Sequence, residues 1–142
     1  MAGIAKQTTA TIIPALHYRD AHAAIDFLCR AFGFEKKAVY EDGQGAVAHA
    51  ELTLGNGMIM LGSVKDTEYG KLLVRPRDAG GVTMSVYVVV ADADAHFARA
   101  KAAGAVITRE PVTQEYGGRD YTAKDPEGNV WTFGTYDPWA AH

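Results

Sequence analysis

Two side chains that could carry out acid–base chemistry, His49 and Glu51, stand two residues apart in the segment 46–54. Small or apolar residues alternate there with polar ones. This pattern predicts a strand from which residues two apart project on the same face. An imidazole beside a carboxylate can act as a general base with its orienting partner, or as two metal ligands. Ligand binding through His49 and a polar pair without chemistry are the other two interpretations.

The strand with this pair belongs to a unit that the sequence uses twice. Residues 10–62 predict a strand, a helix and three further strands, and residues 82–137 predict the same order. The intervening residues 63–81 are polar and rich in turn formers, apart from one short apolar run. They are interpreted either as a linker pinned to the core or as a flap over a pocket. The sequence thus predicts one α+β domain built from two βαβββ modules.

A step of about 72 residues relates the two units. Asp20 and Asp92, both suitable helix N-caps, are 72 residues apart, and Gly33 and Gly104, which end the predicted helices, are 71 apart. Neither unit alone buries both faces of its sheet, which favours pairing of the two.

The stretch 124–134 predicts a tight hairpin. Its turn is the run Asp125-Pro126-Glu127-Gly128-Asn129, in which proline presets φ and the last two residues tolerate positive φ. After the turn, Trp131 and Phe133 lie on one face of a predicted strand, which must face a buried partner. The other face carries small residues that are suited to lining a cavity.

Composition narrows the possible functions. The net charge of −3 over 142 residues gives no reason to expect nucleic acid as a partner. The single cysteine, Cys29, forbids an internal disulfide. Residues 1–10 lack a signal-peptide pattern, and no segment of the chain is apolar enough to span a bilayer. A cytoplasmic protein is therefore expected.

With these features the chain resembles the vicinal oxygen chelate superfamily, which includes glyoxalase I, extradiol dioxygenases, and fosfomycin and bleomycin resistance proteins. The likeness rests on the segment from Tyr18-Arg19-Asp20 to Phe32-Gly33, on the 125–129 hairpin and on the paired modules. His49-Ala50-Glu51-Leu52 with Asn56-Gly57-Met58-Ile59-Met60-Leu61 looks most like the PhnB-like branch of the glyoxalase/bleomycin resistance proteins. The resemblance implies an open curved mixed-sheet barrel around a pocket, usually in a homodimer.

The resemblance also implies four symmetric positions for the ligands of one divalent ion. Here these positions hold Ile13, Met60, Ser85 and Thr132, none of which is a usual ligand for such an ion. Ile13 has no donor atom, and Ser85 and Thr132 offer only weak neutral oxygens. We therefore expect no metal and no other cofactor in this pocket.

The expected pocket wall is apolar, with hydroxyl groups and one aromatic ring. It comprises Ile13, Met58, Met60, Ser85, Tyr87 and Thr132, joined by His49 and Glu51. On the strand 118–124, either Arg119 and Tyr121 or Asp120 and Thr122 face inward. His17 lies either at the mouth of the pocket or at a solvated strand end, whereas His22 and His96 are expected on helix surfaces.

Two functions follow. The first is binding of a small organic molecule in a metal-free pocket, as the bleomycin-resistance branch sequesters its drug. The alternative is a lyase, isomerase or dioxygenase-type enzyme that acts on a small carbonyl or aromatic compound through His49 and Glu51, with or without a metal. The sequence does not identify the ligand or the geometry of the dimer.

Overall fold

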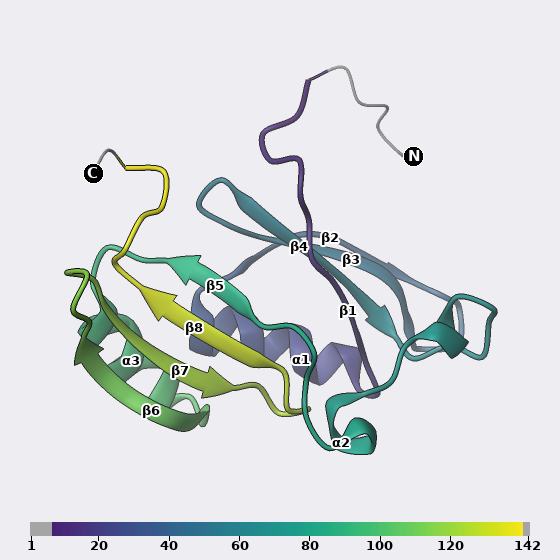
Figure 1. Cartoon of the computed structure of the whole chain (residues 1–142). Helices are drawn as coiled ribbons and strands as arrows, with labels where there is room; N and C mark the ends of the chain where they lie inside the picture. Colours follow the sequence, from purple (N-terminus) through teal and green to yellow (C-terminus); the bar gives the residue numbers. More distant parts are fainter. Residues whose placement is uncertain (1–6, 141–142) are drawn as a thin grey trace.

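Two four-stranded mixed sheets form the protein, which the computed structural model describes over residues 7–140 (Figure 1). The first sheet has the order β1-β4-β3-β2, with β1 parallel to β4 and the other neighbours antiparallel. A helix, α1 (Ala21–Phe27), follows β1 and continues as the π-helical η1 (Leu28–Phe32). The strands are β1 (Ala15–Tyr18), β2 (Glu35–Glu41), β3 (Val47–Leu54) and β4 (Gly57–Ser63).

The second sheet repeats this order as β5-β8-β7-β6, and α3 (Ala93–Ala102) follows β5. The connection from β4 to β5 contains a short 3₁₀ turn, η2 (Gly70–Leu72), and a single helical turn, α2 (Pro76–Ala79). The strands are β5 (Val86–Val89), β6 (Val106–Thr113), β7 (Arg119–Lys124) and β8 (Val130–Gly134). The predicted α+β fold with curved mixed sheets is confirmed, and the sheets do not close into a barrel. Over residues 7–140, no helix has the length and apolar character needed to span a membrane.

The 72-residue step extends to the pairing of individual residues. Ala15 pairs with Met60 in the first sheet, and Tyr87 pairs with Thr132 in the second. Both members of the second pair follow those of the first by 72 residues, as do the neighbouring pairs along the same strands. The two sheets therefore present equivalent positions on equivalent faces.

The predicted helix boundaries are confirmed by their capping groups. The Asp20 side chain accepts a hydrogen bond from the backbone N–H of Ala23 at 3.1 Å, and Asp92 accepts one from Ala95 at 3.0 Å. Gly33 ends η1 with a φ of 89°, a left-handed conformation that glycine adopts without strain.

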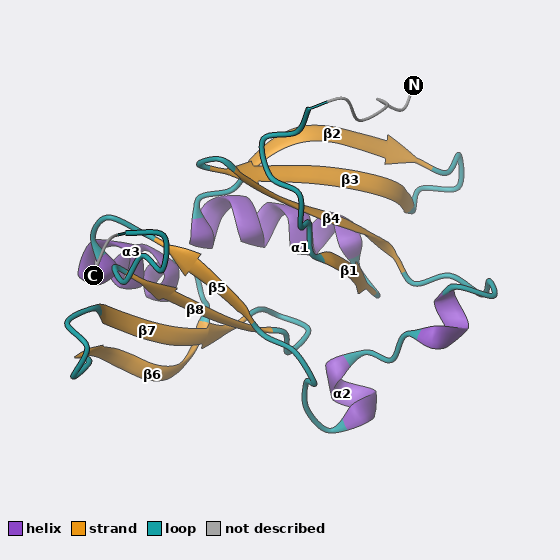
Figure 2. Cartoon of the chain, turned by 45° about the horizontal axis from the view of Figure 1, so that its top comes forward, coloured by secondary structure: helices purple, strands orange, loops and turns teal. Residues whose placement is uncertain are grey.

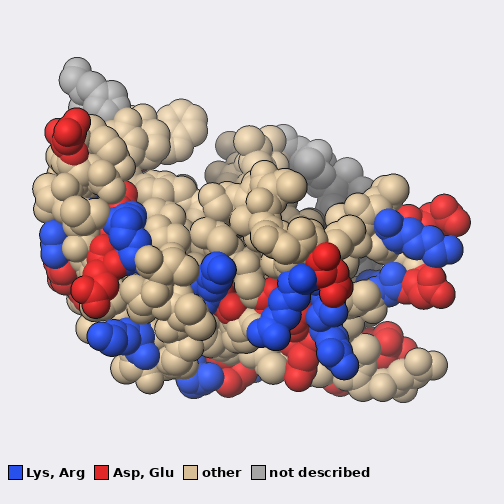
Figure 3. Space-filling view, turned by 60° about the horizontal axis from the view of Figure 1, so that its bottom comes forward, with Lys and Arg blue, Asp and Glu red and all other residues tan. Residues whose placement is uncertain are grey.

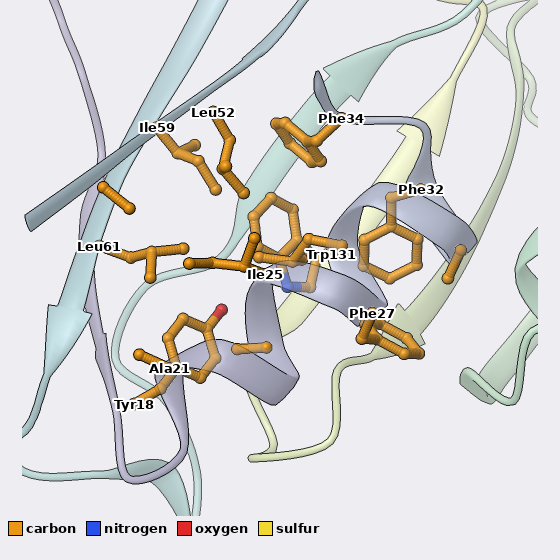
Figure 4. Close-up of a cluster of buried hydrophobic side chains, with 14 of the residues drawn as sticks. Tyr18, Ala21, Ile25, Phe27, Phe32, Phe34, Leu52, Ile59, Leu61 and Trp131 are labelled. Atoms are coloured by element: carbon orange, nitrogen blue, oxygen red, sulfur yellow. The ribbon is translucent and has the colours of Figure 1, made fainter. Parts of the chain in front are cut away.

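The main core lies where α1 and η1 pass between the two sheets (Figure 2). Phe32 is fully buried, and its ring centroid lies 4.6 Å from that of Phe133 and 5.6 Å from that of Trp131. Leu52, Ile59 and Leu61 approach the same helix from the first sheet (Figure 4). One continuous hydrophobic layer thus joins the modules, and Trp131 and Phe133 have the buried partners that the sequence required.

A buried carboxylate organises the 125–129 hairpin. Asp125 is 3% exposed and accepts hydrogen bonds from the Tyr18 hydroxyl at 2.7 Å and the Trp131 indole at 3.1 Å. It also accepts from the backbone N–H groups of Glu127 and Asn129, each at 3.0 Å. Gly128 takes the expected positive φ of 92°, whereas Asn129 does not. The hairpin of the second module is thereby tied to β1 of the first.

Glu127 adds a second polar tie between the modules. Its carboxylate accepts hydrogen bonds from the backbone N–H groups of Arg19 at 2.7 Å and Asp20 at 2.9 Å, just before α1 begins. Arg75 lies 3.9 Å from the same carboxylate and 3.2 Å from that of Asp78. Figure 3 shows basic and acidic side chains side by side on this underside of the molecule. The contact between Arg75 and Glu127 is long, so the shorter hydrogen bonds to backbone N–H groups at the start of α1 matter more.

Three strands differ from their predicted lengths. The sequence of residues 11–18 predicts a strand, but β1 begins only at Ala15, after Pro14. The sequence of residues 82–90 also predicts a strand, which is reduced to β5. The sequence further predicts that Pro111 breaks the strand that starts at Val106, and this is wrong, because β6 continues to Thr113. Its register shifts between Arg109 and Val112, and β6 is an edge strand. A bulge on an edge strand leaves no ladder bond for proline to break.

The prediction that His96 lies on a helix surface is also wrong, while His22 is exposed as expected. His96 Nε2 lies 2.8 Å from the Phe32 carbonyl oxygen, and its Nδ1 meets the Tyr121 hydroxyl. Since a carbonyl only accepts, Nε2 carries the proton and Nδ1 accepts from Tyr121. The ring stacks on Phe133 at 4.2 Å between centroids. His96 thus links α3 to η1 and to the second sheet.

The protein is expected to lose stability as the pH falls below neutrality. Burial lowers the pKa of His96, and the charge of Arg99 adds to this, against the opposing effect of the Phe32 carbonyl. The unfolded chain takes up a proton at this imidazole below about pH 6.5, and the folded chain only at lower pH. The unfolded state therefore binds more protons in that range, so this stabilisation is complete above about pH 6.5 and is lost below it. Urea unfolding of wild-type protein and His96→Gln between about pH 7.5 and 5 measures this effect.

The His96→Gln variant should show a shallower pH dependence. It should not be flat, because burial also lowers the pKa of His17. Phe97→Leu is the control, since it weakens the same helix contact to Tyr121 without removing an imidazole and should keep the wild-type slope. Equal slopes in His96→Gln and wild-type protein would contradict the prediction.

Candidate functional site

The face of each sheet that points away from the helices is termed its open face. On the first sheet its central row runs from His17 on β1 to Gly62 on β4, with which it pairs. The antiparallel pairing of β3 and β4 runs as far as Ala50–Leu61, and His49 and Gly62 are the next residues along the two strands. Because neighbouring strands are about 4.8 Å apart, the backbones of the two histidines are about 10 Å apart. Gly62 is closely packed, because a Cβ atom there would lie 3.0 Å from the Ala48 carbonyl oxygen.

A cavity of about 200 Å³ is lined by His17, Gly62 and His49. Residues 65–73 lie over it, so the part of the chain interpreted as either linker or flap covers the open face of the first sheet. The floor and walls include Ala15, Leu16, His17, Ala48, His49, Met60, Leu61, Gly62 and Ser63, and the cover contributes Lys65, Thr67, Tyr69, Gly70 and Leu73.

The covering segment is held by two local contacts. Lys65 Nζ donates to the Ala48 carbonyl at 2.6 Å, which fixes the start of the segment to β3. Thr67 Oγ1 accepts from the Gly70 N–H at 3.0 Å and closes the following turn. A Cβ atom on Gly70 would lie 2.0 Å from the Lys65 carbonyl oxygen, so the turn requires glycine.

The predicted pair is in contact. His49 Nε2 and Glu51 Oε2 are 3.0 Å apart, with the two side chains 40% and 26% exposed. The His49 ring stacks on Tyr40 of the neighbouring strand at 6.2 Å between centroids and 17° between planes. The Glu51 carboxylate orients the imidazole that lines the cavity, and this arrangement suits either ligand binding or proton transfer.

His17 is the second histidine of the cavity. Burial lowers its pKa and the nearby Arg75 lowers it further, against an opposing effect of Glu127, which favours a neutral ring. Within residues 7–140 its buried Nε2 has no hydrogen-bond partner. An unsatisfied buried nitrogen costs free energy, which a polar group of a bound molecule would relieve.

The open face of the second sheet carries a different set of groups. Asp120, 4% exposed, bonds to Arg109 and accepts from Gln114 Nε2 at 3.0 Å and the Tyr116 hydroxyl at 3.2 Å. Burial alone would raise the pKa of Asp120, but the hydrogen bonds from Gln114 and Arg109 outweigh it and lower the pKa. By strand register Asp120 corresponds to His49 of the first sheet, opposite Gly134. The hydrogen-bonding capacity of this carboxylate is therefore used by side chains of the protein itself.

The structure does not bring all the predicted site residues together. On β7, Asp120 and Thr122 lie on the open face. The interpretation in which Arg119 and Tyr121 face the pocket is therefore wrong. Tyr121 is fully buried against His96 and Phe97, and Arg119 pairs with Asp94 on α3 at 2.8 Å.

The other predicted wall residues divide between the two sheets. Met60 and His49 line the covered cavity, while Met58 and Tyr87 line a separate cleft. Ile13 is half-buried just before β1 and Ser85 is exposed just before β5. Thr132 bonds to Thr122 at 2.9 Å between hydroxyl oxygens.

The donors at the four implied metal positions do not fit a divalent ion. Ile13 and Met60 offer no hard donor, Ser85 is exposed, and the Thr132 hydroxyl is engaged by Thr122. Elsewhere in residues 7–140, no three His, Cys, Asp or Glu side chains are grouped so as to hold a metal ion.

Residues 12–133 match the Glyoxalase/Bleomycin resistance protein/Dioxygenase superfamily. The chain belongs to this superfamily. An uncharacterized protein of Mycobacterium bovis, Mb0911c, is 31% identical over 121 residues, which cover 85% of this chain and 80% of that protein.

Solved structures with the same fold support this assignment. TioX from Micromonospora sp. ML1 superposes with a TM-score of 0.70 at 33% identity, covering 88% of this chain and 97% of TioX. A glyoxalase/bleomycin resistance protein/dioxygenase superfamily member from Sphaerobacter thermophilus gives 0.66 at 19% identity, covering 88% and 97%. At that identity the second likeness concerns the fold alone. The resemblance inferred from the hairpin and the repeated modules is thus confirmed at the level of the superfamily.

Sequence reasoning missed the cavity residues outside the first sheet's strands, above all Tyr69 and Leu73. The signal for Leu73 was the apolar run 72–74 inside the segment 63–81, which is compatible with a flap, whereas Tyr69 lies in the polar stretch before that run. Arg109, Gln114 and Tyr116 were also missed, because their role depends on converging on Asp120.

Proposed function

We propose that this superfamily member binds a small organic molecule, without a metal ion, in the cavity between the first sheet and residues 65–73. The observation that carries the proposal is the covered cavity itself, lined by His17 and the oriented His49. The unsuitable donors at the superfamily's metal positions support the metal-free part. Placement in the PhnB-like branch, homodimeric assembly and a cytoplasmic location stay predictions.

The lining restricts the class of ligand. A volume of about 200 Å³ lies below the roughly 300–1,000 Å³ typical of drug-sized sites, which favours a compact molecule. Leu16, Met60 and Leu73 suit an apolar body, while the two histidines suit a hydroxyl or carbonyl group. Methionine adapts to several shapes, so more than one related compound should bind.

The proposal is tested by a thermal-shift screen of small aromatic and carbonyl compounds, followed by calorimetric titration of the hits. His49→Ala should weaken binding of each hit by at least about tenfold, because the oriented imidazole is lost and Glu51 is left unpaired. His22→Ala is the matched control, since it removes an exposed imidazole outside the cavity. If no compound stabilises the wild-type protein, or both variants bind equally well, the proposal fails.

A second variant in the same titrations tests the cover. Gly70→Ala should displace residues 65–73 through the clash with the Lys65 carbonyl and should also weaken binding. Lys71→Ala is the control, because its exposed side chain makes only a 3.9 Å contact with Asp66. Unchanged affinity in Gly70→Ala would show that the cover takes no part in binding.

The contact between His49 and Glu51 favours one alternative, a lyase, isomerase or dioxygenase-type enzyme. Glu51 would hold His49 ready to accept a proton from a carbon next to a carbonyl group. Glu51→Gln would then abolish turnover while the fold remained intact. A metal ion retained at about one per chain and lost in His49→Ala would support the metal-dependent form of this alternative.

A further inference from the structure

A second and larger hollow, of about 770 Å³, lies where the helix between the two sheets ends. The space between the sheets is filled by α1 and η1 up to Gly33, after which the chain turns away into β2. Phe34, Leu54 and Ile59 then face Val86, Val88 and Val90 across an unfilled gap. All six also pack on the hydrophobic core, so the cleft is a continuation of the core layer beyond the helix end.

The mouth of this cleft differs from its interior. Ile59 and Phe34 are 3% and 5% exposed at the deep end, whereas Ile12 and Trp139 are 87% and 95% exposed at the mouth. Asp137 and Trp139 both line the cleft, and the Asp137 carboxylate accepts the backbone N–H of Trp139 at 2.9 Å. Tyr87 supplies a third aromatic ring, and its hydroxyl donates to the Tyr136 carbonyl at 2.7 Å.

The charge of the lining is one-sided. Among the described residues that line the cleft, Asp137 is the only charged one, and there is no lysine, arginine or histidine. Aromatic faces attract cations, and a carboxylate at the rim attracts them further. An organic anion would instead meet the Asp137 charge and a chain of net charge −3.

We propose that this cleft is a second binding site, separate from the covered cavity, and that it takes an apolar organic cation such as a hydrophobic amine or onium ion. The apolar body lies against the valines of β5 and the Leu54–Ile59 side of the first sheet. The positive charge lies at the mouth, between Asp137 and the rings of Trp139 and Tyr87. Burial of the apolar body drives binding, and the mouth selects the sign of the charge.

The test uses two probes of nearly equal size and opposite charge, tetraphenylphosphonium and tetraphenylborate. Calorimetric titration of the wild-type protein should give a dissociation constant at least about tenfold lower for the phosphonium. Asp137→Asn should remove most of this preference. Ala91→Arg, which adds a cation to an exposed residue of the lining, should reverse it.

Two control variants distinguish binding in this cleft from a general effect of net charge and from binding in the covered cavity. Asp66→Asn makes the same change of net charge at a side chain that is 94% exposed and outside the cleft, and should keep the preference. His49→Ala, which alters the covered cavity, should also keep it. The proposal is overturned by equal affinity for the two probes, by equal losses in Asp137→Asn and Asp66→Asn, or by loss of phosphonium binding in His49→Ala. Absence of binding of either probe up to about 1 mM overturns it as well.

Discussion

Replacing Asp125 by alanine should lower the free energy of unfolding by about 3–5 kcal/mol. The substitution deletes the common acceptor of four hydrogen bonds, two of which come from the buried side chains of Tyr18 and Trp131. Burial first, and then the charge of Asp125, raise the pKa of Tyr18 well above its usual value, so the hydroxyl stays protonated as a donor. Without the carboxylate these donors are buried and unpaired.

Urea unfolding followed by far-UV circular dichroism measures this loss. Asp125→Asn should be intermediate, because the amide oxygen still accepts while its NH₂ group faces other donors. The control Asp66→Ala, at a carboxylate 94% exposed, should change stability by less than about 0.5 kcal/mol. A midpoint for Asp125→Ala close to that of Asp66→Ala would mean that the buried network contributes little.

Phe32→Ala should cost about 3–5 kcal/mol by leaving a cavity in the layer that joins the modules. Phe32 is fully buried, and the rings of Phe27, Trp131 and Phe133 all lie within 5.6 Å of it between centroids. Because the first helix and the second sheet share this ring, we expect both modules to unfold in one transition.

Two probes of unfolding check this expectation. Circular dichroism reports the whole chain. Fluorescence measured in the Trp139→Ala background, where Trp131 is the one remaining tryptophan, reports the second sheet beside the helix. The two curves should coincide and shift together in Phe32→Ala. Trp139→Ala truncates an aromatic residue that is 95% exposed and should change stability by less than about 0.5 kcal/mol. Separate transitions, or a loss in Phe32→Ala no larger than in Trp139→Ala, would contradict a shared core.

The sequence could predict features that depend on near neighbours. The caps Asp20 and Asp92, the alternation that buries Trp131 and Phe133, and the shared face of His49 and Glu51 all follow from periods of 3.6 and 2 residues. The 72-residue step is also found in the strand pairing, because equivalent strands of the two modules pair in equivalent registers.

Features that depend on the approach of distant segments could not be predicted in this way. Period-two alternation on β7 separates Tyr121 from Asp120, but only the docking of α3 decides which of them is buried beneath the helix. His96 has the spacing of a surface residue, yet it is a half-buried link, because Phe32, 64 residues away, presents a carbonyl oxygen to it.

The candidate site shows the same division. The amino-acid sequence could predict the fold class, the superfamily and the pair His49–Glu51, since these rest on local pattern and on a repeated unit. Three further features required the folded chain: residues 65–73 cover the first sheet, His17 joins His49 across Gly62, and the core layer opens into a cleft past Gly33. Such cavities and clefts depend on how segments distant in sequence are placed relative to one another, and the packing of the whole chain determines that placement.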